Sequence, residues 1–228
     1  ELRHKNRVLL IWKSGGLHSM KSFTHKGFLH MTDRKPLDDT ALDTLFSGAR
    51  SYNGWQNRDV PDSLLRHIYD LMKWGPTSAN SSPLRIVFVR SGAAKEKLKP
   101  LLDKGNRDKT MEAPVVALFA VDRKFYRHAH KLAPHVDVEK WYGGRDEANK
   151  ETAALNGTLQ AAYFMLAARA AGLDCGPMSG LDKQAVKEAF FPDLDGEVKF
   201  ICSLGYGRPE TLHPRAQRLD FEEAAIIV

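Results

Sequence analysis

Apolar residues between positions 36 and 228 recur at helical spacing in some segments and form short unbroken runs in others. Helical spacing predicts helices over 38–49, 61–74, 93–104, 124–133, 147–171 and 182–190. Apolar runs predict strands over 86–90, 114–121 and 199–204. The run at 114–121 is apolar throughout, which is typical of a central strand covered on both faces. Because helices and strands are interspersed, the pattern predicts an α/β or α+β domain.

The longest predicted helix, 147–171, is the most apolar one. Between Ala161 and Ala171 its only charged residue is Arg169, so we expect a helix that is enclosed on most sides, as it would be against a partner subunit. Residues 134–145 show no period and predict an irregular loop. The end of the chain, 221–228, is apolar enough to predict docking onto the protein.

The net charge of +6 comes from the first 35 residues of the chain. Residues 1–35 carry eight Lys or Arg and two acids, whereas residues 36–228 carry twenty-six of each sign. A nucleic-acid partner would require a basic face on the folded part, so none is expected. The apolar run 8–12 is too short to span a membrane. We interpret residues 1–35 as a leader or artificial extension outside the core, with a targeting peptide as the alternative, and 36–228 as one domain.

Two cysteines, Cys175 and Cys202, stand in apolar surroundings without a CxxC motif. Both are expected to be buried thiols, which suits a reducing cytoplasm and disfavours a disulfide scaffold. The histidines of the leader (His18, His25 and His30) could bind metal, although solvated side chains are the simpler interpretation.

Candidate chemistry lies in three polar clusters and one basic fragment. The clusters are Ala49–Trp55, Lys73–Pro83 and Leu173–Gly180, and the fragment is Arg215–Arg218. Arginines pair with phosphate oxygens, while small residues and backbone amides allow a flat ring to approach the chain. No cluster contains a well-placed general base. This combination suits a protein that holds a reactive cofactor, although each cluster could separately be a turn, a helix end or a solvated surface.

Other motifs are incomplete. Gly205-Tyr206-Gly207 lacks the third glycine and the following helix of a dinucleotide fingerprint. Ser78 and Ser179 have no evident His/Asp partners, so a serine hydrolase is unsupported. No Walker motif or zinc spacing is present in the sequence.

The order and spacing of the clusters resemble the FMN-dependent nitroreductase family. In that family an early Arg-Ser segment meets the FMN phosphate and ribityl chain, and a Pro-[Ser/Thr]-Ser-x-Asn loop borders the flavin from the partner subunit. A Gly-x-Pro-x-x-Gly stretch faces flavin N5, and a basic pair returns to the phosphate. The resemblance implies flavin-binding roles for Arg50, Ser51, Asn53, Pro76, Ser78, Asn80, Pro177, Met178, Ser179, Gly180, Arg215 and Arg218. It implies no catalytic side chain and no metal, because N5 carries the chemistry.

The resemblance also implies the architecture and the reaction. The expected fold is α+β, a central mixed sheet flanked by helices, in an intertwined cytoplasmic homodimer with FMN at the interface. NADH or NADPH would reduce the flavin, and a small acceptor would then enter the same slot, a ping-pong scheme. Four segments most resemble in sequence the malonic semialdehyde reductases of pyrimidine breakdown, which form 3-hydroxypropionate (53–55, 72–80, 176–180 and 205–207).

Two departures from the family pattern affect the expected site. Asn53 and Gly54 occupy the region where many nitroreductases carry a second Lys or Arg, and Ser82 replaces a glutamine before the loop proline. Three alternatives therefore stay open: a broad nitro or quinone reductase, a flavin-storage protein without turnover, and a purely structural module.

Overall fold

Four strands form the centre of the protein. They lie in the order β1 (Leu84–Val89), β2 (Val115–Asp122), β4 (Gly196–Gly205) and β3 (Asp174–Met178), and every neighbouring pair is antiparallel. The α+β class is confirmed, but the expectation of a mixed sheet is wrong for these strands. Each strand reverses the direction of its neighbour, and the parallel contact at the β3 edge is an isolated bridge between Ser51 and Cys175.

This computed structural model describes residues 35–228, and Asp38–Val228 form one compact unit. The interpretation of residues 1–35 as a leader, with its histidines, therefore falls outside the described residues apart from Lys35. β2 is the central strand that its apolar run predicts, since Val115 to Val121 are all fully buried.

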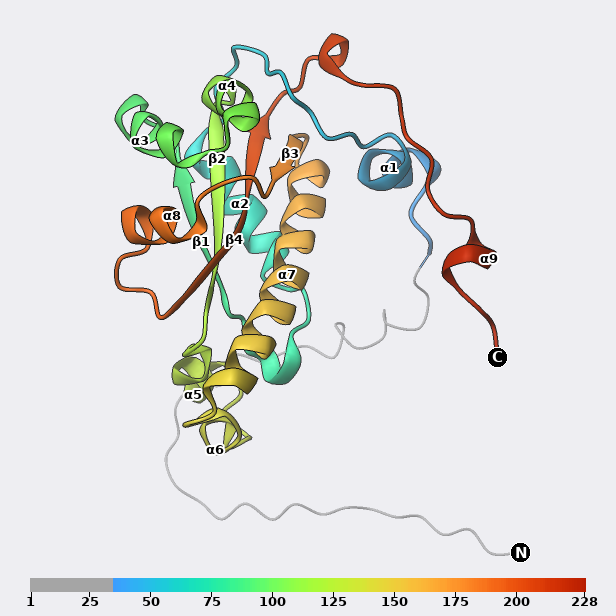
Figure 1. The fold of residues 1–228 in the computed structure, drawn as a ribbon. Helices are drawn as coiled ribbons and strands as arrows, with labels where there is room; N and C mark the ends of the chain where they lie inside the picture. Colours follow the sequence, from blue (N-terminus) through green and yellow to red (C-terminus); the bar gives the residue numbers. More distant parts are fainter. Residues whose placement is uncertain (1–34) are drawn as a thin grey trace, which may run out of the picture. The chain divides into compact units, whose positions relative to one another are not determined.

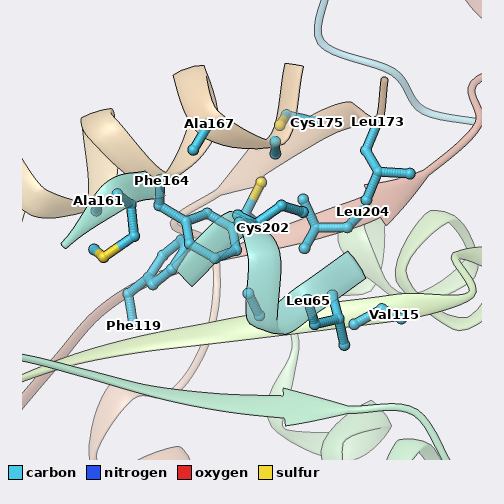
Figure 2. Packing of buried hydrophobic residues seen from close by; sticks show 14 of the residues in the cluster. Leu65, Val115, Phe119, Ala161, Phe164, Ala167, Leu173, Cys175, Cys202 and Leu204 are labelled. Atoms are coloured by element: carbon cyan, nitrogen blue, oxygen red, sulfur yellow. The ribbon is translucent and has the colours of Figure 1, made fainter. Parts of the chain in front are cut away.

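One face of the sheet is covered by α2 (Asp62–Met72) and α7 (Asp146–Ala170), as Figure 1 shows. The core on this face joins both helices to all four strands (Figure 2). Phe119 of β2 lies at its centre, with its ring centroid 5.1 Å from Phe164 of α7 and 4.9 Å from Phe200 of β4. These aromatic contacts fix the register of the long helix on the sheet.

The opposite face is covered by α3 (Gly92–Leu98), α4 (Lys104–Glu112) and α8 (Lys183–Phe190). Leu98 and Val186 pack there against the strand residues whose side chains alternate away from the first face. Trp55, only 2% exposed, joins the same core. The segment that contains the first polar cluster is therefore anchored in the domain interior.

Several predicted elements differ from the observed ones. The helix expected at 38–49 is α1 (Asp39–Leu42) followed by a π-helical turn, Asp43–Ser47. The segment 134–145, expected to be irregular, contains α6 (Val138–Tyr142), and 124–133 is divided between a 3-10 turn and α5 (Ala129–Leu132). α4 was not expected at all, because its sequence has no apolar period.

Both cysteines are fully buried and unpaired by a disulfide, as expected. They pack beside one another on the α7 face of β3 and β4 (Figure 2). A hydrogen bond with Cys175, together with burial, raises the pKa of Cys202 well above the ordinary thiol range. These thiols are packing groups held in the protonated form.

The C-terminal tail does not dock onto its own chain as its composition suggested. After α9 (Phe221–Ala224), the side chains of Ile226, Ile227 and Val228 are almost fully exposed. Leu155, Leu159 and Tyr163 on the outer face of α7 are also exposed. None of the helices within residues 35–228 has the length and apolarity needed to cross a bilayer.

Candidate functional site

The first polar cluster is threaded between β3 and the chain that follows β4. The Tyr52 N–H donates to the Cys175 carbonyl at 3.1 Å, and the Arg208 N–H donates to the Gly54 carbonyl at 3.0 Å. Gly207 allows the close contact, since a Cβ there would lie 2.1 Å from the Tyr52 ring. The Gly-Tyr-Gly sequence is thus a packing feature.

Two arginines tie this cluster to the C-terminal segment in a reciprocal way. Arg50 Nη2 donates to the His213 carbonyl at 2.5 Å, and Arg215 Nη2 donates to the Ala49 carbonyl at 3.0 Å. The two cations and the exposed Ser51 therefore gather at one place. Arg218 does not join them, because its guanidinium bonds to the neighbouring carbonyls of Ala216 and Gln217.

The third cluster forms the end of β3 and the turn after it. A Cβ on Gly176 would lie 2.6 Å from the Tyr52 carbonyl oxygen, so only glycine lets this strand approach the first cluster. Pro177 and Ser179 are exposed, and Met178 is half-buried. Within residues 35–228, no hydrogen bond engages the N–H groups of Ser179 and Gly180. These two donors are therefore available to a ligand.

Helix α4 supplies site residues that sequence reasoning missed. Asn106 Nδ2 donates to the Gly180 carbonyl at 2.9 Å, and the Lys109 ammonium lies 3.4 Å from Asn53 Oδ1. Thr110, fully buried, donates to the Met178 sulfur at 3.7 Å. α4 thus links the first and third clusters and places a cation beside Asn53. A run of polar residues between two apolar segments, Asn106 to Thr110, was the one available signal.

Two ionisable groups beneath the cluster have shifted pKa values. Burial raises the pKa of Asp174, and the N–H of Gly207, which donates to Asp174 Oδ2 at 2.8 Å, partly offsets the effect. Burial and the Asp174 charge raise the pKa of Tyr52, while nearby Arg50 opposes the rise.

The second cluster lies elsewhere on the same chain. Its Ser78 N–H donates to Asn156 in the first half of α7, whereas the third cluster begins just beyond the other end of that helix. A rise of about 1.5 Å per residue separates the two points by about 20 Å along the helix. Pro76, Ser78 and Asn80 are exposed and do not meet Arg50 or Ser179 within one chain.

The gathered groups suit a phosphorylated, flat, polar ligand. Arg50 and Arg215 can pair with a phosphate, and the Ser179 and Gly180 N–H groups can donate to ring atoms. A metal has no comparable set, since in the described residues no three His, Cys, Asp or Glu side chains come close enough to hold one.

Comparison with known proteins shows the family of the chain. The family model described as "Nitroreductase family" matches residues 47–206, which contain the three polar clusters and the long helix. The chain belongs to the nitroreductase family.

Relatives and solved structures of nitroreductases align along most of the chain. A protein of Ralstonia nicotianae, provisionally named NADH dehydrogenase/NAD(P)H nitroreductase, is 50% identical over 193 residues, 84% of this chain and 98% of the relative. A nitroreductase of Bacillus subtilis superposes with a TM-score of 0.75 at 25% identity, covering 83% of this chain and 99% of its own. A nitroreductase of Exiguobacterium sibiricum, solved in complex with FMN, gives 0.73 at 20% identity, with 86% and 100% covered, and supports the shared fold.

Proposed function

We propose that this nitroreductase is an FMN-dependent NAD(P)H oxidoreductase whose flavin lies between the first and third clusters. The convergence of Arg50, Arg215 and the unpaired N–H groups of Ser179 and Gly180 carries the proposal. The Exiguobacterium relative, which binds FMN, and the names of the relatives support it. When bound, FMN supplies the two-electron carrier that no side chain here provides.

Each residue of the site then has a task in binding or orientation. Arg50 and Arg215 hold the phosphate, with Ser51 as an additional donor. The N–H groups of Ser179 and Gly180 would orient the ring. Lys109, next to Asn53, places positive charge at a third point of the rim, where it would stabilise negative charge on a bound ligand.

The second half of the site comes from a partner subunit in this proposal. Within one chain, the Pro76–Pro83 loop is far from the arginines, while α7 exposes Leu155, Leu159 and Tyr163. A homodimer packed on that face covers the apolar side chains and brings the partner's Pro76–Pro83 loop to the flavin. The exposed tail 221–228 is a second element that can cross to the partner.

The absorption spectrum of the purified protein, before and after anaerobic addition of NADH or NADPH, tests the flavin proposal. We expect a yellow protein that is bleached by one of the two nucleotides. A yellow protein that resists both would favour flavin storage. A colourless protein unable to bind added FMN would contradict the proposal altogether.

For the acceptor, we propose malonic semialdehyde, reduced to 3-hydroxypropionate in a ping-pong reaction. The four segments that resemble malonic semialdehyde reductases support this choice (53–55, 72–80, 176–180 and 205–207). A broad nitro or quinone reductase is the second candidate, supported by the names of the relatives. Steady-state kcat/KM with malonic semialdehyde, a nitroaromatic and a quinone separates them, and a preference for the nitroaromatic would refute the narrower choice.

A further inference from the structure

The Pro76–Pro83 loop has an unfavourable backbone. Ala79, Asn80 and Ser82 all have positive φ angles, of 50°, 50° and 43°. Such angles are costly for L-residues other than glycine, and asparagine tolerates them best. A loop of this shape persists only where its surroundings hold it.

Asn156 of α7 holds the start of the loop. Its Oδ1 accepts the Ser78 N–H at 2.7 Å, and its Nδ2 donates to the Thr152 carbonyl of the same helix at 2.8 Å. The second bond fixes the amide so that the oxygen faces the loop. Asn156 is only 1% exposed, so water does not compete for this bond.

Gln160, one turn further along α7, holds the other end. Its Oε1 accepts the Leu84 N–H at 2.9 Å, where the loop enters β1, and it is 5% exposed. Gly157 between the two amides allows the helix to lie close enough, because a Cβ there would lie 2.2 Å from Val121 Cγ1. Two amides at i and i+4 therefore grip both ends of one strained loop.

The gripped loop presents unused donors. Within residues 35–228, the Ala79 N–H and the Ser78 hydroxyl make no hydrogen bond, although the N–H groups of Asn80, Ser81 and Ser82 are all paired inside the loop. Ala79 lies in the first turn of the 3-10 segment Ser78–Asn80, where an N–H has no partner within the helix. The loop therefore keeps a donor for a ligand.

We infer that Asn156 and Gln160 are positioning residues that clamp the Pro76–Pro83 loop in its ligand-binding shape. The inference rests on the proposed function, because the ligand of this loop is the flavin of the partner subunit. The two amides do not touch that ligand. They act through Ser78, Ala79 and Leu84, whose backbone they hold.

Asn156→Leu tests the clamp, since leucine keeps the volume and removes the acceptor. We expect the dissociation constant of FMN from the dimer to rise by about ten- to hundredfold, as follows from one buried bond and a relaxed loop. In the apoprotein, hydrogen exchange of the Ser78 amide should become fast, whereas the wild type protects it. The exchange measurement does not depend on a bound cofactor.

Asn149→Leu is the matched control. Asn149 lies on the same helix, is 2% exposed, and donates through Nδ2 to the Tyr142 carbonyl at 2.8 Å, away from the loop. Asn149→Leu should lower the melting temperature while leaving FMN affinity within about twofold of wild type, because distant sites act independently. Equal losses of FMN affinity in both variants would show a general loss of packing and overturn the clamp.

Asn156→Asp should restore the FMN affinity that Asn156→Leu loses, and the restoration should depend on pH. A buried carboxyl has a raised pKa, and its protonated form both accepts from Ser78 and donates to Thr152, as the amide does. FMN affinity should therefore approach the wild-type value at about pH 5.5 and weaken towards pH 8. If wild type binds FMN and Asn156→Leu matches it in affinity and in Ser78 exchange, the clamp is wrong and the proposed function stands. If wild type binds no FMN, the proposed function fails first.

Discussion

Arg50 has unused hydrogen-bond donors at the place where Arg215 also lies. A guanidinium has five N–H donors, and the hydrogen bonds within residues 35–228 use one nitrogen of Arg50, on the His213 carbonyl. The others can meet a phosphate in a paired geometry that lysine cannot reproduce. Arg215 has the same arrangement with Ala49, so backbone carbonyls rather than acids hold the two arginines of the proposed phosphate site.

Replacing these arginines should separate binding residues from surface charges. We expect Arg50→Ala to raise the FMN dissociation constant by about ten- to hundredfold, the value of one or two charged hydrogen bonds. Arg218→Ala removes the same charge from an exposed side chain that bonds only to Ala216 and Gln217, and it should have a much smaller effect. Fluorescence titration of the apoprotein with FMN measures both, and equal effects would contradict this assignment of the phosphate ligands.

Asp174 predicts a pH dependence of stability. Because burial raises its pKa in the folded state, the folded protein binds this proton more tightly than the unfolded chain. The stabilisation is fully present below the unfolded pKa, about 3.9, and is lost as pH rises through the higher folded pKa. Asp174→Asn keeps an acceptor for Gly207 but cannot ionise. Its free energy of unfolding should therefore gain on that of wild type as pH rises above about 4, the unfolded pKa.

Urea unfolding at several pH values measures this difference. Asp174→Ala is the control, because it loses the acceptor of the Gly207 N–H and should be less stable than Asp174→Asn at every pH. A constant difference between wild type and Asp174→Asn across the range would mean that the carboxyl has an ordinary pKa.

At the scale of elements, α7 determines where the other parts lie. It packs along the sheet through Phe164, holds the Pro76–Pro83 loop through its amides, and donates through Arg169 Nη1 to the Leu45 carbonyl ahead of the first cluster. A shift of this one helix would therefore move both the Pro76–Pro83 loop and the segment ahead of the first cluster.

Gly157→Ala should show how closely α7 must approach the sheet. Alanine favours the helix by about 1 kcal/mol, but the added methyl group would lie 2.2 Å from Val121 Cγ1. We expect a net destabilisation of about 1–3 kcal/mol from overpacking. Gly92→Ala, at the start of α3 with nothing within 4 Å, should be neutral or slightly stabilising. Chemical denaturation compares them, and a Gly157→Ala protein as stable as wild type would show that the helix can move.

The whole molecule exposes an apolar surface that one chain leaves uncovered. Leu155 is 63% exposed on α7, and Trp74 is 81% exposed at the start of the loop. Apolar surface concentrated on the longest helix is typical of a protein–protein interface. Our proposed dimer unites the two half-sites that lie about 20 Å apart on one chain.

Leu155→Glu should therefore abolish dimer formation and flavin binding together. We expect a shift from dimer to monomer in sedimentation velocity and a loss of bound flavin, with the fold of the monomer retained in its circular dichroism. Lys183→Gln changes the net charge by the same amount at an exposed residue of α8 and should alter neither property. A monomeric Leu155→Glu protein that still retains flavin would refute the shared site.

The local sequence predicted some elements and some buried positions correctly. The apolar run of β2 and the setting of Cys175 and Cys202 predicted burial that the structure confirms. The period of 147–171 predicted a helix that is present, but Leu155 and Tyr163 of its apolar stripe are exposed in one chain. The family was evident from three clusters in a fixed order. α4 was missed because its stability comes from contacts such as Thr110 with Met178 and Trp55 with the Lys109 carbonyl, not from its own period.

By itself, the sequence determined the long helix, the central strand and several other elements, the order of the polar clusters, and the chemistry that the clusters can support, because propensity, periodicity and side-chain type are local properties. Only the tertiary structure decided that the strand pairs are antiparallel, that Arg215 rather than Arg218 meets the first cluster, and that Asn156 grips the loop. Those outcomes depend on hydrogen bonds between residues that lie far apart in the chain and meet only when the sheet and α7 are packed together.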